Sequence, residues 1–171
     1  MEYELAIIGG GPAGVSAGVY ASRKKLKTIF ITKEFGGQSN VSEDIQNWIG
    51  TPHVNGLDFA KMLETHLKTY AENIVDIKLG EKVKKVSKHS EGFLIETEGG
   101  EKFEAKTVLL TMGSTRRKLT VPGADKFENN GITYCASCDG PLYSGQDVAV
   151  IGGGNAGFET AAQLSAYCKS V

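Results

Sequence analysis

The chain has 171 residues, of which 40% are hydrophobic and 23% are charged, and its formal net charge is -1. These values are typical of a folded globular protein with one substantial core or two small ones, and they exclude a disordered chain. A chain this close to neutrality has no positive field to attract a phosphate backbone, so we expect no nucleic-acid partner.

Hydropathy and cysteine usage predict the compartment. The apolar runs are shorter than the ~20 residues needed to span a bilayer, so we expect no membrane partner. The run at residues 5–8 leads into a glycine loop instead of a signal-peptide cleavage site. Three cysteines are present, and the pair Cys135 and Cys138 suits a reducing compartment with one functional dithiol. The sequence therefore predicts a cytoplasmic protein.

The first elements form a strand, a glycine loop, a helix and a second strand. Residues 3–8 predict the first strand, residues 9–14 read Gly-Gly-Gly-Pro-Ala-Gly, residues 13–25 have helical periodicity, and residues 28–32 predict the second strand. This order is the context in which a glycine loop binds a dinucleotide. Gly9 would allow the tight turn, Gly11 the approach of a pyrophosphate, and Gly14 close packing of helix on strand. A purely structural glycine turn is the alternative.

An acidic residue is expected near the end of the second strand of such a unit, where it hydrogen-bonds a ribose. Glu34 stands at this place, although a solvated loop charge is an alternative interpretation. Residues 33–56 contain several glycines and Pro52 among polar residues, and they predict a long functional loop.

The following elements continue an α/β pattern. Residues 57–72 predict a helix, residues 74–77 a strand, and residues 82–87, 93–97 and 102–105 a three-stranded antiparallel meander. Residues 107–111 predict a separate apolar strand. Residues 114–146 contain Arg116-Arg117-Lys118, Pro122-Gly123 and Asn129-Asn130-Gly131, which indicate a domain boundary.

A second glycine loop follows this boundary. Residues 147–151 predict a strand, residues 152–157 read Gly-Gly-Gly-Asn-Ala-Gly, and residues 158–167 predict a helix, so that residues 149–163 repeat residues 5–19. We therefore predict an α/β fold: a Rossmann-like three-layer unit with an antiparallel β-meander insertion over residues 1–113, and the start of a second Rossmann-like unit over residues 114–171.

The Cys135 and Cys138 pair lies between the two glycine loops. A Cys-x-x-Cys pair forms a disulfide that opens and closes, whereas a zinc site requires two further ligands that Cys168 and three scattered histidines do not supply. We therefore expect no metal. Asp139 directly follows Cys138 and is a candidate general acid, with a solvated Asp-Gly turn as the alternative.

Seven segments, in their order and spacing along the whole chain, resemble the low-molecular-weight thioredoxin reductases and the related flavoprotein component of alkyl hydroperoxide reductase. These segments are residues 9–14, 35–38, 46–48, 110–113, 121–123, 134–140 and 150–159. The resemblance implies a homodimer that uses FAD and either NADPH or NADH, and that reduces a disulfide of a thioredoxin-like protein.

The resemblance also implies roles for individual residues. Cys138 would be the thiol near the flavin, Cys135 the thiol that attacks the partner disulfide, and Asp139 the proton donor and acceptor. The residues implied for FAD are Gly9, Gly11, Pro12, Ala13, Gly14, Gly37, Gln38, Asn47 and Gly113. The residues implied for NADPH or NADH are Gly152, Gly154, Asn155, Ala156 and Glu159.

Two departures from the family pattern affect these expectations. Met112 stands where the family usually has a threonine, which removes a hydroxyl from that position. The family's chain is also roughly twice as long as this one, consistent with two domains of ordinary size. We therefore expect the missing half to be supplied by the rest of the gene product. The alternatives are a truncated or split FAD-binding fragment that is inactive alone, and a flavoprotein reductase linked to a peroxiredoxin or glutaredoxin.

Overall fold

The computed structural model describes residues 2–115, 117–128 and 130–171, so Arg116 and Asn129 of the predicted boundary lie outside the described residues. The chain divides into two compact units, which we call unit 1 (Met1–Thr115) and unit 2 (Arg116–Val171). The assignment of residues 1–113 to FAD and of residues 114–171 to a nicotinamide nucleotide stays a prediction.

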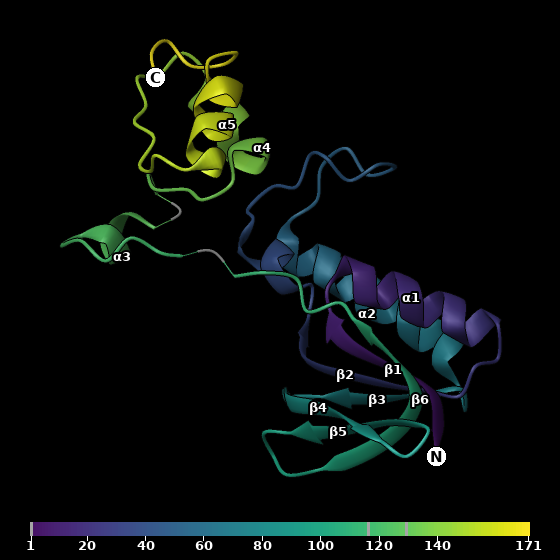
Figure 1. Ribbon diagram of the computed structural model, residues 1–171. Helices are drawn as coiled ribbons and strands as arrows, with labels where there is room; N and C mark the ends of the chain where they lie inside the picture. The colour runs from purple at the N-terminus through teal and green to yellow at the C-terminus, as the bar shows by residue number, and fades with distance from the viewer. Residues whose placement is uncertain (1, 116, 129) are drawn as a thin grey trace. The chain divides into compact units, whose positions relative to one another are not determined.

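Unit 1 contains one six-stranded sheet with the strand order β3-β2-β1-β6-β5-β4 (Figure 1). Strands β1, β2, β3 and the end of β6 are parallel, whereas β4, β5 and the start of β6 are antiparallel. The strands are β1 (Tyr3–Gly10), β2 (Thr28–Phe35), β3 (Val75–Leu79), β4 (Val83–His89), β5 (Gly92–Thr97) and β6 (Lys102–Leu110). The helices are α1 (Pro12–Arg23), the 3-10 helix η1 (Gly37–Val41) and α2 (Gly56–Ala71). The predicted Rossmann-like unit with a β-meander is confirmed.

One predicted pair of strands is wrong. Residues 102–105 and 107–111 were expected as two strands, but Lys102–Leu110 forms the single strand β6. Ala105 pairs with Phe93 of β5 on one side and with Tyr3 of β1 on the other. Because β6 extends beyond β5 and continues along β1, the antiparallel meander and the parallel strands form one mixed sheet.

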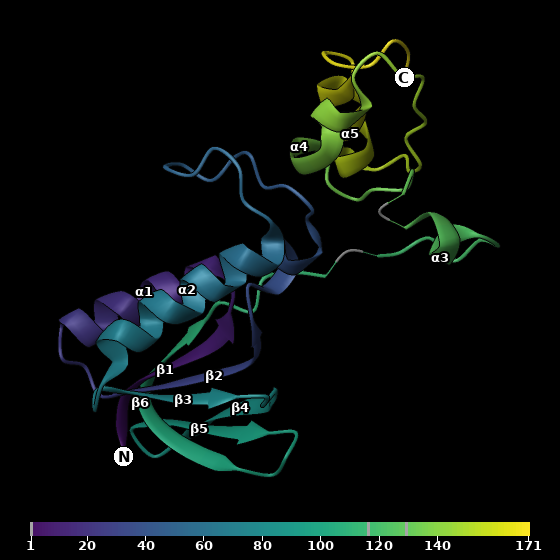
Figure 2. The ribbon, with the colours of Figure 1, turned by 180° about the vertical axis from the view of Figure 1, so that it is seen from behind.

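The sheet of unit 1 has a core on each of its faces. Ile7 and Phe30 face α1 and α2 and pack with Leu67, whereas Ile8 and Ile31 lie on the other face and belong to a cluster with Ile95, Phe103 and Ala105. Figures 1 and 2 show α1 and α2 side by side over one face of β1 and β2, with β4 and β5 on the opposite side. Burial on both faces explains why β1 and β2 are continuous apolar runs instead of alternating ones. The predicted three-layer arrangement is confirmed.

Tyr3 at the start of β1 makes the sheet sensitive to alkaline pH. Its side chain is buried, and its hydroxyl donates a hydrogen bond to Asp76 Oδ2 at 2.9 Å. Burial, with a further contribution from this hydrogen bond, raises the pKa of Tyr3 above its ordinary value of 10.0. The protonated phenol is therefore favoured in the folded state, and its stabilisation is complete below pH 10 and is lost as the pH rises further.

We expect the free energy of unfolding to fall by about 1 kcal/mol per pH unit above about pH 10 because of Tyr3. Denaturant unfolding of the parental chain and of Tyr3→Phe between about pH 8 and about pH 11 measures this fall, since phenylalanine has no proton to lose. An equally steep alkaline fall in Tyr3→Phe would exclude Tyr3 as its cause.

Unit 2 consists of short helices and extended segments. Its elements are α3 (Ala124–Phe127), α4 (Ala136–Asp139), the 3-10 helix η2 (Gly140–Tyr143) and α5 (Asn155–Leu164). The strand expected over residues 147–151 is not formed, and only a bridge between Asp147 and Ser170 is present there. A strand requires a neighbouring strand for its backbone hydrogen bonds, and the described part of unit 2 contains none beside residues 148–151.

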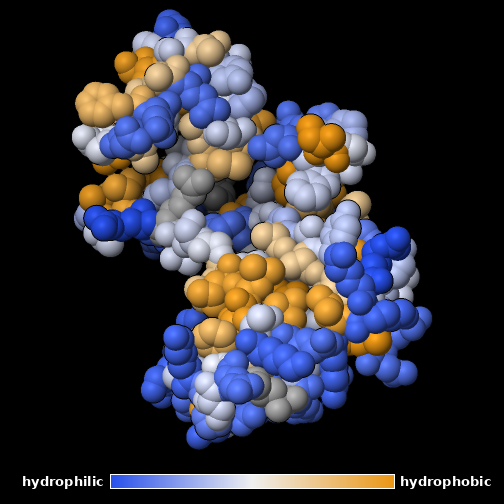
Figure 3. Space-filling view, turned by 45° about the vertical axis from the view of Figure 1, so that its right-hand side comes forward, coloured by the Kyte–Doolittle hydropathy of each residue, from blue (hydrophilic) through white to orange (hydrophobic). Residues whose placement is uncertain are grey.

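Apolar side chains near the second glycine loop of unit 2 are exposed. Ile151 is 73% exposed and Phe158 is 71% exposed, and orange areas are visible on the molecular surface (Figure 3). Helix α5 begins three residues earlier than predicted, because Gly154 in extended conformation serves as its N-cap directly after the glycine loop. Of the helices in the described ranges, none has the length and apolar character required to cross a membrane.

Candidate functional site

The first glycine loop joins the end of β1 to the start of α1. Gly9 has a φ of +115°, a conformation that side chains with a Cβ rarely adopt. A Cβ atom on Gly14 would lie 1.8 Å from the carbonyl oxygen of Gly9, so only glycine at position 14 allows α1 to approach the loop this closely. Two of the predicted roles, the turn at Gly9 and the close packing at Gly14, correspond to this geometry.

The N-terminus of α1 has the properties of an anion-binding site. Gly11 is its N-cap, Pro12 is its first residue, and no side chain caps the free N–H groups. No acidic residue occupies the first turn, where a carboxylate would occupy the anion's place. A Cβ atom on Gly11 would meet nothing within 4 Å, so the space in front of this backbone is open. Gly11, Pro12 and Ala13 thus fit the pyrophosphate group of a dinucleotide.

The segment after β2 approaches the same loop. The N–H group of Gly36 donates to the carbonyl oxygen of Gly10 at 3.0 Å, and a Cβ atom on Gly37 would lie 3.6 Å from Cα of Gly11. Gln38 follows on η1 with an exposed side chain. Asn47 is exposed in the loop between η1 and α2, and none of the described hydrogen bonds joins its side chain to the glycine loop. The structure thus brings Gly37 to the glycine loop, whereas the role of Asn47 along FAD stays a prediction.

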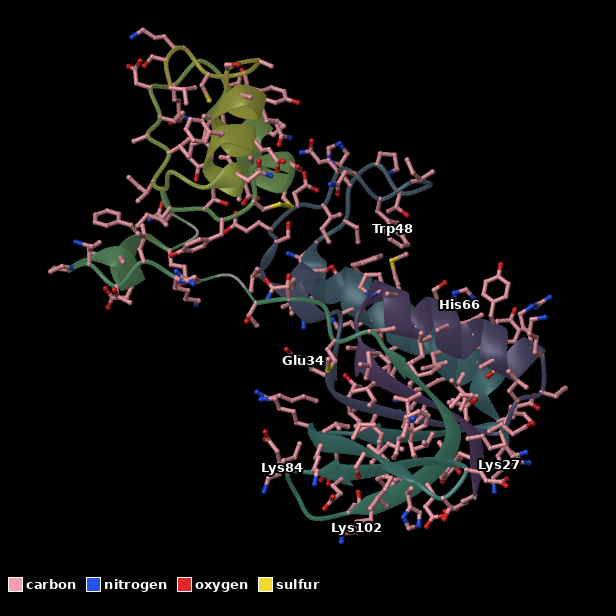
Figure 4. All side chains as sticks on the ribbon, viewed as in Figure 1. Lys27, Glu34, Trp48, His66, Lys84 and Lys102 are labelled. Carbon is pink, nitrogen blue, oxygen red and sulfur yellow. A yellow bond between two sulfur atoms is a disulfide. The ribbon has the colours of Figure 1, made fainter. Side chains whose placement is uncertain are left out.

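Glu34 lies near the end of β2 (Figure 4). It lines a cavity of about 440 Å³ whose lining also includes residues from the first half of α2. Its other polar lining residues are Lys33, Asn40, Lys61 and Glu64, and its apolar lining residues are Phe35, Leu57, Ala60 and Leu79. The Glu34 side chain is exposed, so its carboxylate is available to a ligand. The role of Glu34 as a ribose ligand stays a prediction.

The site around the first glycine loop also includes Thr111, which was not identified from the sequence. Its hydroxyl lies 2.9 Å from the carbonyl oxygen of Ile8 and 3.1 Å from that of Gly9, and it thereby connects the end of β6 to the glycine loop. Its neighbour Met112 is 64% exposed. Gly113 has a φ of +64° and open space around it, which leaves its backbone accessible. Position 112 thus lacks the hydroxyl that the family usually has there, whereas the neighbouring hydroxyl of Thr111 has a structural role.

The second glycine loop repeats the geometry of the first within unit 2. Gly152 has a φ of +136°, Gly154 is the N-cap of α5, and a Cβ atom on Gly157 would lie 2.3 Å from the carbonyl oxygen of Gly152. The start of α5 likewise lacks a capping side chain and an acidic residue in its first turn. Asn155 donates to Glu159 at 2.7 Å on the exposed face of α5, next to the exposed Ala156. This loop thus also fits a dinucleotide phosphate.

Cys135 and Cys138 form a disulfide in unit 2 (Figure 4). Cys135 is the N-cap of α4 and is half-buried, whereas Cys138 is exposed. The N–H group of Cys138 donates to Sγ of Cys135 at 3.2 Å. After reduction, this hydrogen bond would favour the thiolate form of Cys135, which is the nucleophilic form of a cysteine.

The side chain of Asp139 is held by Thr133. Asp139 is half-buried at the end of α4, and its Oδ2 accepts a hydrogen bond from the Thr133 hydroxyl. Thr133 was not identified from the sequence, because a threonine two residues before a Cys-x-x-Cys pair is not a recognised signal. Ser137 and Gln163 form a hydrogen bond of 3.2 Å that links α4 to α5. Within the described ranges, no group of three His, Cys, Asp or Glu side chains is arranged to hold a metal ion.

Comparison with known families and proteins gives consistent matches over the chain. Residues 3–171 match the profile of the pyridine nucleotide-disulphide oxidoreductase family. The chain is 38% identical over 169 residues to a protein named NADH dehydrogenase from Bacillus subtilis, covering 99% of this chain and 32% of that protein. It is 37% identical to the F subunit of alkyl hydroperoxide reductase from Escherichia coli, with the same coverage.

Solved structures give a similar result. Thioredoxin reductase from Streptococcus pyogenes superposes with a TM-score of 0.87 at 35% sequence identity, covering 98% of this chain and 53% of that chain. Thioredoxin reductase from Giardia duodenalis has the same TM-score at 28% identity, covering 98% of this chain and 54% of that chain. The chain thus spans about a third of the length of the curated relatives and about half of that of the solved reductases.

Proposed function

Because the chain belongs to the pyridine nucleotide-disulphide oxidoreductase family, we propose that it passes electrons from NADPH or NADH through FAD to the Cys135–Cys138 disulfide. From there the electrons would reach a disulfide of a thioredoxin-like protein. The observation that carries this proposal is the disulfide itself, which lies on a short helix with Asp139 in the same turn and in which Sγ of Cys135 accepts the backbone N–H group of Cys138. Such a position suits thiol–disulfide exchange with another protein.

Family membership implies FAD and NADPH or NADH as cofactors. When bound, they supply the hydride and two-electron chemistry that protein side chains lack. In our proposal the free N–H groups of α1 bind the FAD pyrophosphate, and Glu34 binds its ribose. The corresponding loop at the start of α5 binds the nicotinamide nucleotide through Gly152, Gly154, Asn155, Ala156 and Glu159. Gly37, Gln38, Asn47 and Gly113 are proposed to lie along FAD.

The exchange with the partner follows from the arrangement of the three catalytic side chains. In the reduced dithiol, the Cys135 thiolate attacks a sulfur of the partner disulfide, forms a mixed disulfide and displaces a partner thiolate. Asp139 gives this thiolate the proton that the Cys135 thiol lost when its thiolate formed, and it then takes the proton of the Cys138 thiol. The Cys138 thiolate attacks Sγ of Cys135, which re-forms the disulfide and releases the second partner thiolate, and Asp139 protonates this one too. Two thiols of the chain are oxidised and one partner disulfide is reduced.

A second acceptor is favoured by the curated relatives. Several of them, at 37 to 39% identity, are named as the F subunit of alkyl hydroperoxide reductase. A disulfide of a peroxide-reducing partner would accept electrons from the dithiol by the same exchange step. The proposed setting in both cases is a homodimer in the cytoplasm.

The test is an anaerobic titration of the chain with FAD and then with NADPH or NADH. We expect the chain to bind flavin, and we expect the reduced nucleotide to convert the Cys135–Cys138 disulfide into two thiols per chain. Oxidised thioredoxin-like and peroxiredoxin-type proteins, added separately, then identify the acceptor by the rate at which the thiols disappear. Bound flavin without any release of thiols would contradict the proposed electron route and would favour a fragment that only binds flavin.

A further inference from the structure

We propose that Thr133 is a positioning residue that holds Asp139 in the orientation required to protonate the thiolate leaving during disulfide exchange. This inference rests on the proposed function, because it concerns the same dithiol. The juxtaposition that carries it is a chain of two hydrogen bonds through one hydroxyl, from the Cys135 backbone to Thr133 and from Thr133 to Asp139.

The direction of the Thr133 hydroxyl is fixed by its two partners. Its oxygen accepts a hydrogen bond from the N–H group of Cys135 at 3.3 Å. A hydroxyl has one proton to donate, and here that proton is directed to Oδ2 of Asp139. Oδ2 is therefore used as an acceptor, and the proton exchanged in the reaction belongs on Oδ1. The carboxyl group is thus held through one oxygen and reacts through the other.

The anchoring of Asp139 converges on Cys135. The backbone N–H group of Asp139 donates to the carbonyl oxygen of Cys135 at 2.9 Å, and its side chain is joined through Thr133 to the N–H group of Cys135. Asp139 and Thr133 are both half-buried, so water competes only partly for these bonds. The side chain of Asp139 is therefore fixed relative to the backbone of Cys135, the residue whose sulfur attacks the partner disulfide in our proposal.

A purely structural role of Thr133 makes a different prediction. If the hydroxyl only stabilised the turn before α4, its loss would slow every reaction of the dithiol by the same factor. If it positions a proton donor, its loss slows the first displacement, by the Cys135 thiolate, only where the leaving thiolate needs a proton. The thiolate of an aromatic thiol with a low pKa leaves without a proton. The thiolate of an alkyl thiol with a high pKa leaves faster when it is protonated.

The experiment uses the full chain with Cys168→Ser in every variant, so that only Cys135 and Cys138 react. The reduced protein is mixed at neutral pH with dithiobis(nitrobenzoate), whose leaving aromatic thiol has a low pKa, or with hydroxyethyl disulfide, whose leaving alkyl thiol has a high pKa. The rate of the first displacement is measured in each case. We expect Thr133→Val to slow the reaction with hydroxyethyl disulfide about tenfold, which is a modest share of the effect of a general acid. The rate with the aromatic disulfide is expected to stay within about twofold of the parental rate. Thr133→Ser keeps the hydroxyl and is expected to restore both rates.

Asp139→Asn separates failure of this inference from failure of the proposed function. If Asp139→Asn slows only the hydroxyethyl disulfide reaction and Thr133→Val slows neither reaction, Thr133 has no positioning role. Asp139 is then still supported as the proton donor. If Asp139→Asn changes neither reaction, the proposed catalytic role of Asp139 is wrong, and the inference fails with it. Equal slowing of both reactions by Thr133→Val also overturns the inference. Circular dichroism checks that each variant is folded. If Thr133→Val is unfolded, Thr133→Ala replaces it, and the rates with the two disulfide reagents are compared in the same way.

Discussion

Replacing Gly14 by alanine is expected to lower the unfolding temperature of unit 1 by about 10 °C. The new Cβ would lie 1.8 Å from the carbonyl oxygen of Gly9 and 2.8 Å from Oγ1 of Thr111. The backbone oxygen has no rotamer by which to avoid this contact, so α1 must move away from β1. We expect an overpacking cost of about 3 kcal/mol, which outweighs the gain of about 1 kcal/mol from the higher helix propensity of alanine.

Gly11→Ala is the matched control, with the opposite expected outcome. A Cβ at position 11 meets nothing within 4 Å, and the φ of -73° suits alanine. We expect a change in stability of less than about 1 kcal/mol, since alanine is a poorer N-cap than glycine. The methyl group would, however, occupy the open space in front of the α1 N–H groups, so we expect FAD affinity to fall about tenfold or more.

Thermal unfolding followed by circular dichroism and flavin titration followed by fluorescence separate the two variants. An unchanged unfolding temperature in Gly14→Ala would show that the close approach of α1 to β1 is not needed for stability. Unchanged flavin affinity in Gly11→Ala, with the fold intact, would remove the phosphate-binding role from this loop.

The parts of the fold that follow from local rules were predictable from the sequence. The two glycine loops require particular backbone angles, and only glycine supplies them at positions 9 and 152, where φ is +115° and +136°. The order of strand, loop and helix around them therefore indicated the parallel half of the sheet before any contact was known. The pairing of Cys135 with Cys138 was likewise open to prediction, because the two residues are only three positions apart.

Features that depend on distant parts of the chain were not predictable in this way. The length of β6 is set by two neighbours, since β5 pairs with its first half and β1 with its second. Residues 147–151 have the composition of a strand, but strand formation requires a partner that local sequence does not specify. Thr111 bonds to a carbonyl group 103 residues away, so its role is visible only in the folded chain.

Cys138→Ser is expected to convert a transient mixed disulfide into a stable one. Cys135 is the N-cap of α4, and the backbone N–H group of residue 138 donates to its sulfur whatever side chain residue 138 carries. The Cys135 thiolate therefore still attacks the partner disulfide, but no thiol at position 138 remains to displace the partner. With Cys168→Ser as background, we expect the covalent complex with an oxidised thioredoxin-like protein to accumulate at least about tenfold over the parental chain.

Cys135→Ser in the same background is the control, because it retains the exposed sulfur of Cys138 and removes the one that accepts the backbone hydrogen bond. Mass spectrometry of the non-reduced proteins measures the complex and identifies the cysteine that carries it. A complex formed by Cys135→Ser and not by Cys138→Ser would reverse the assigned roles of the two thiols. Multiple turnovers by Cys138→Ser at the parental rate would be more serious, since electrons would then reach the acceptor without the dithiol and the proposed route would be wrong.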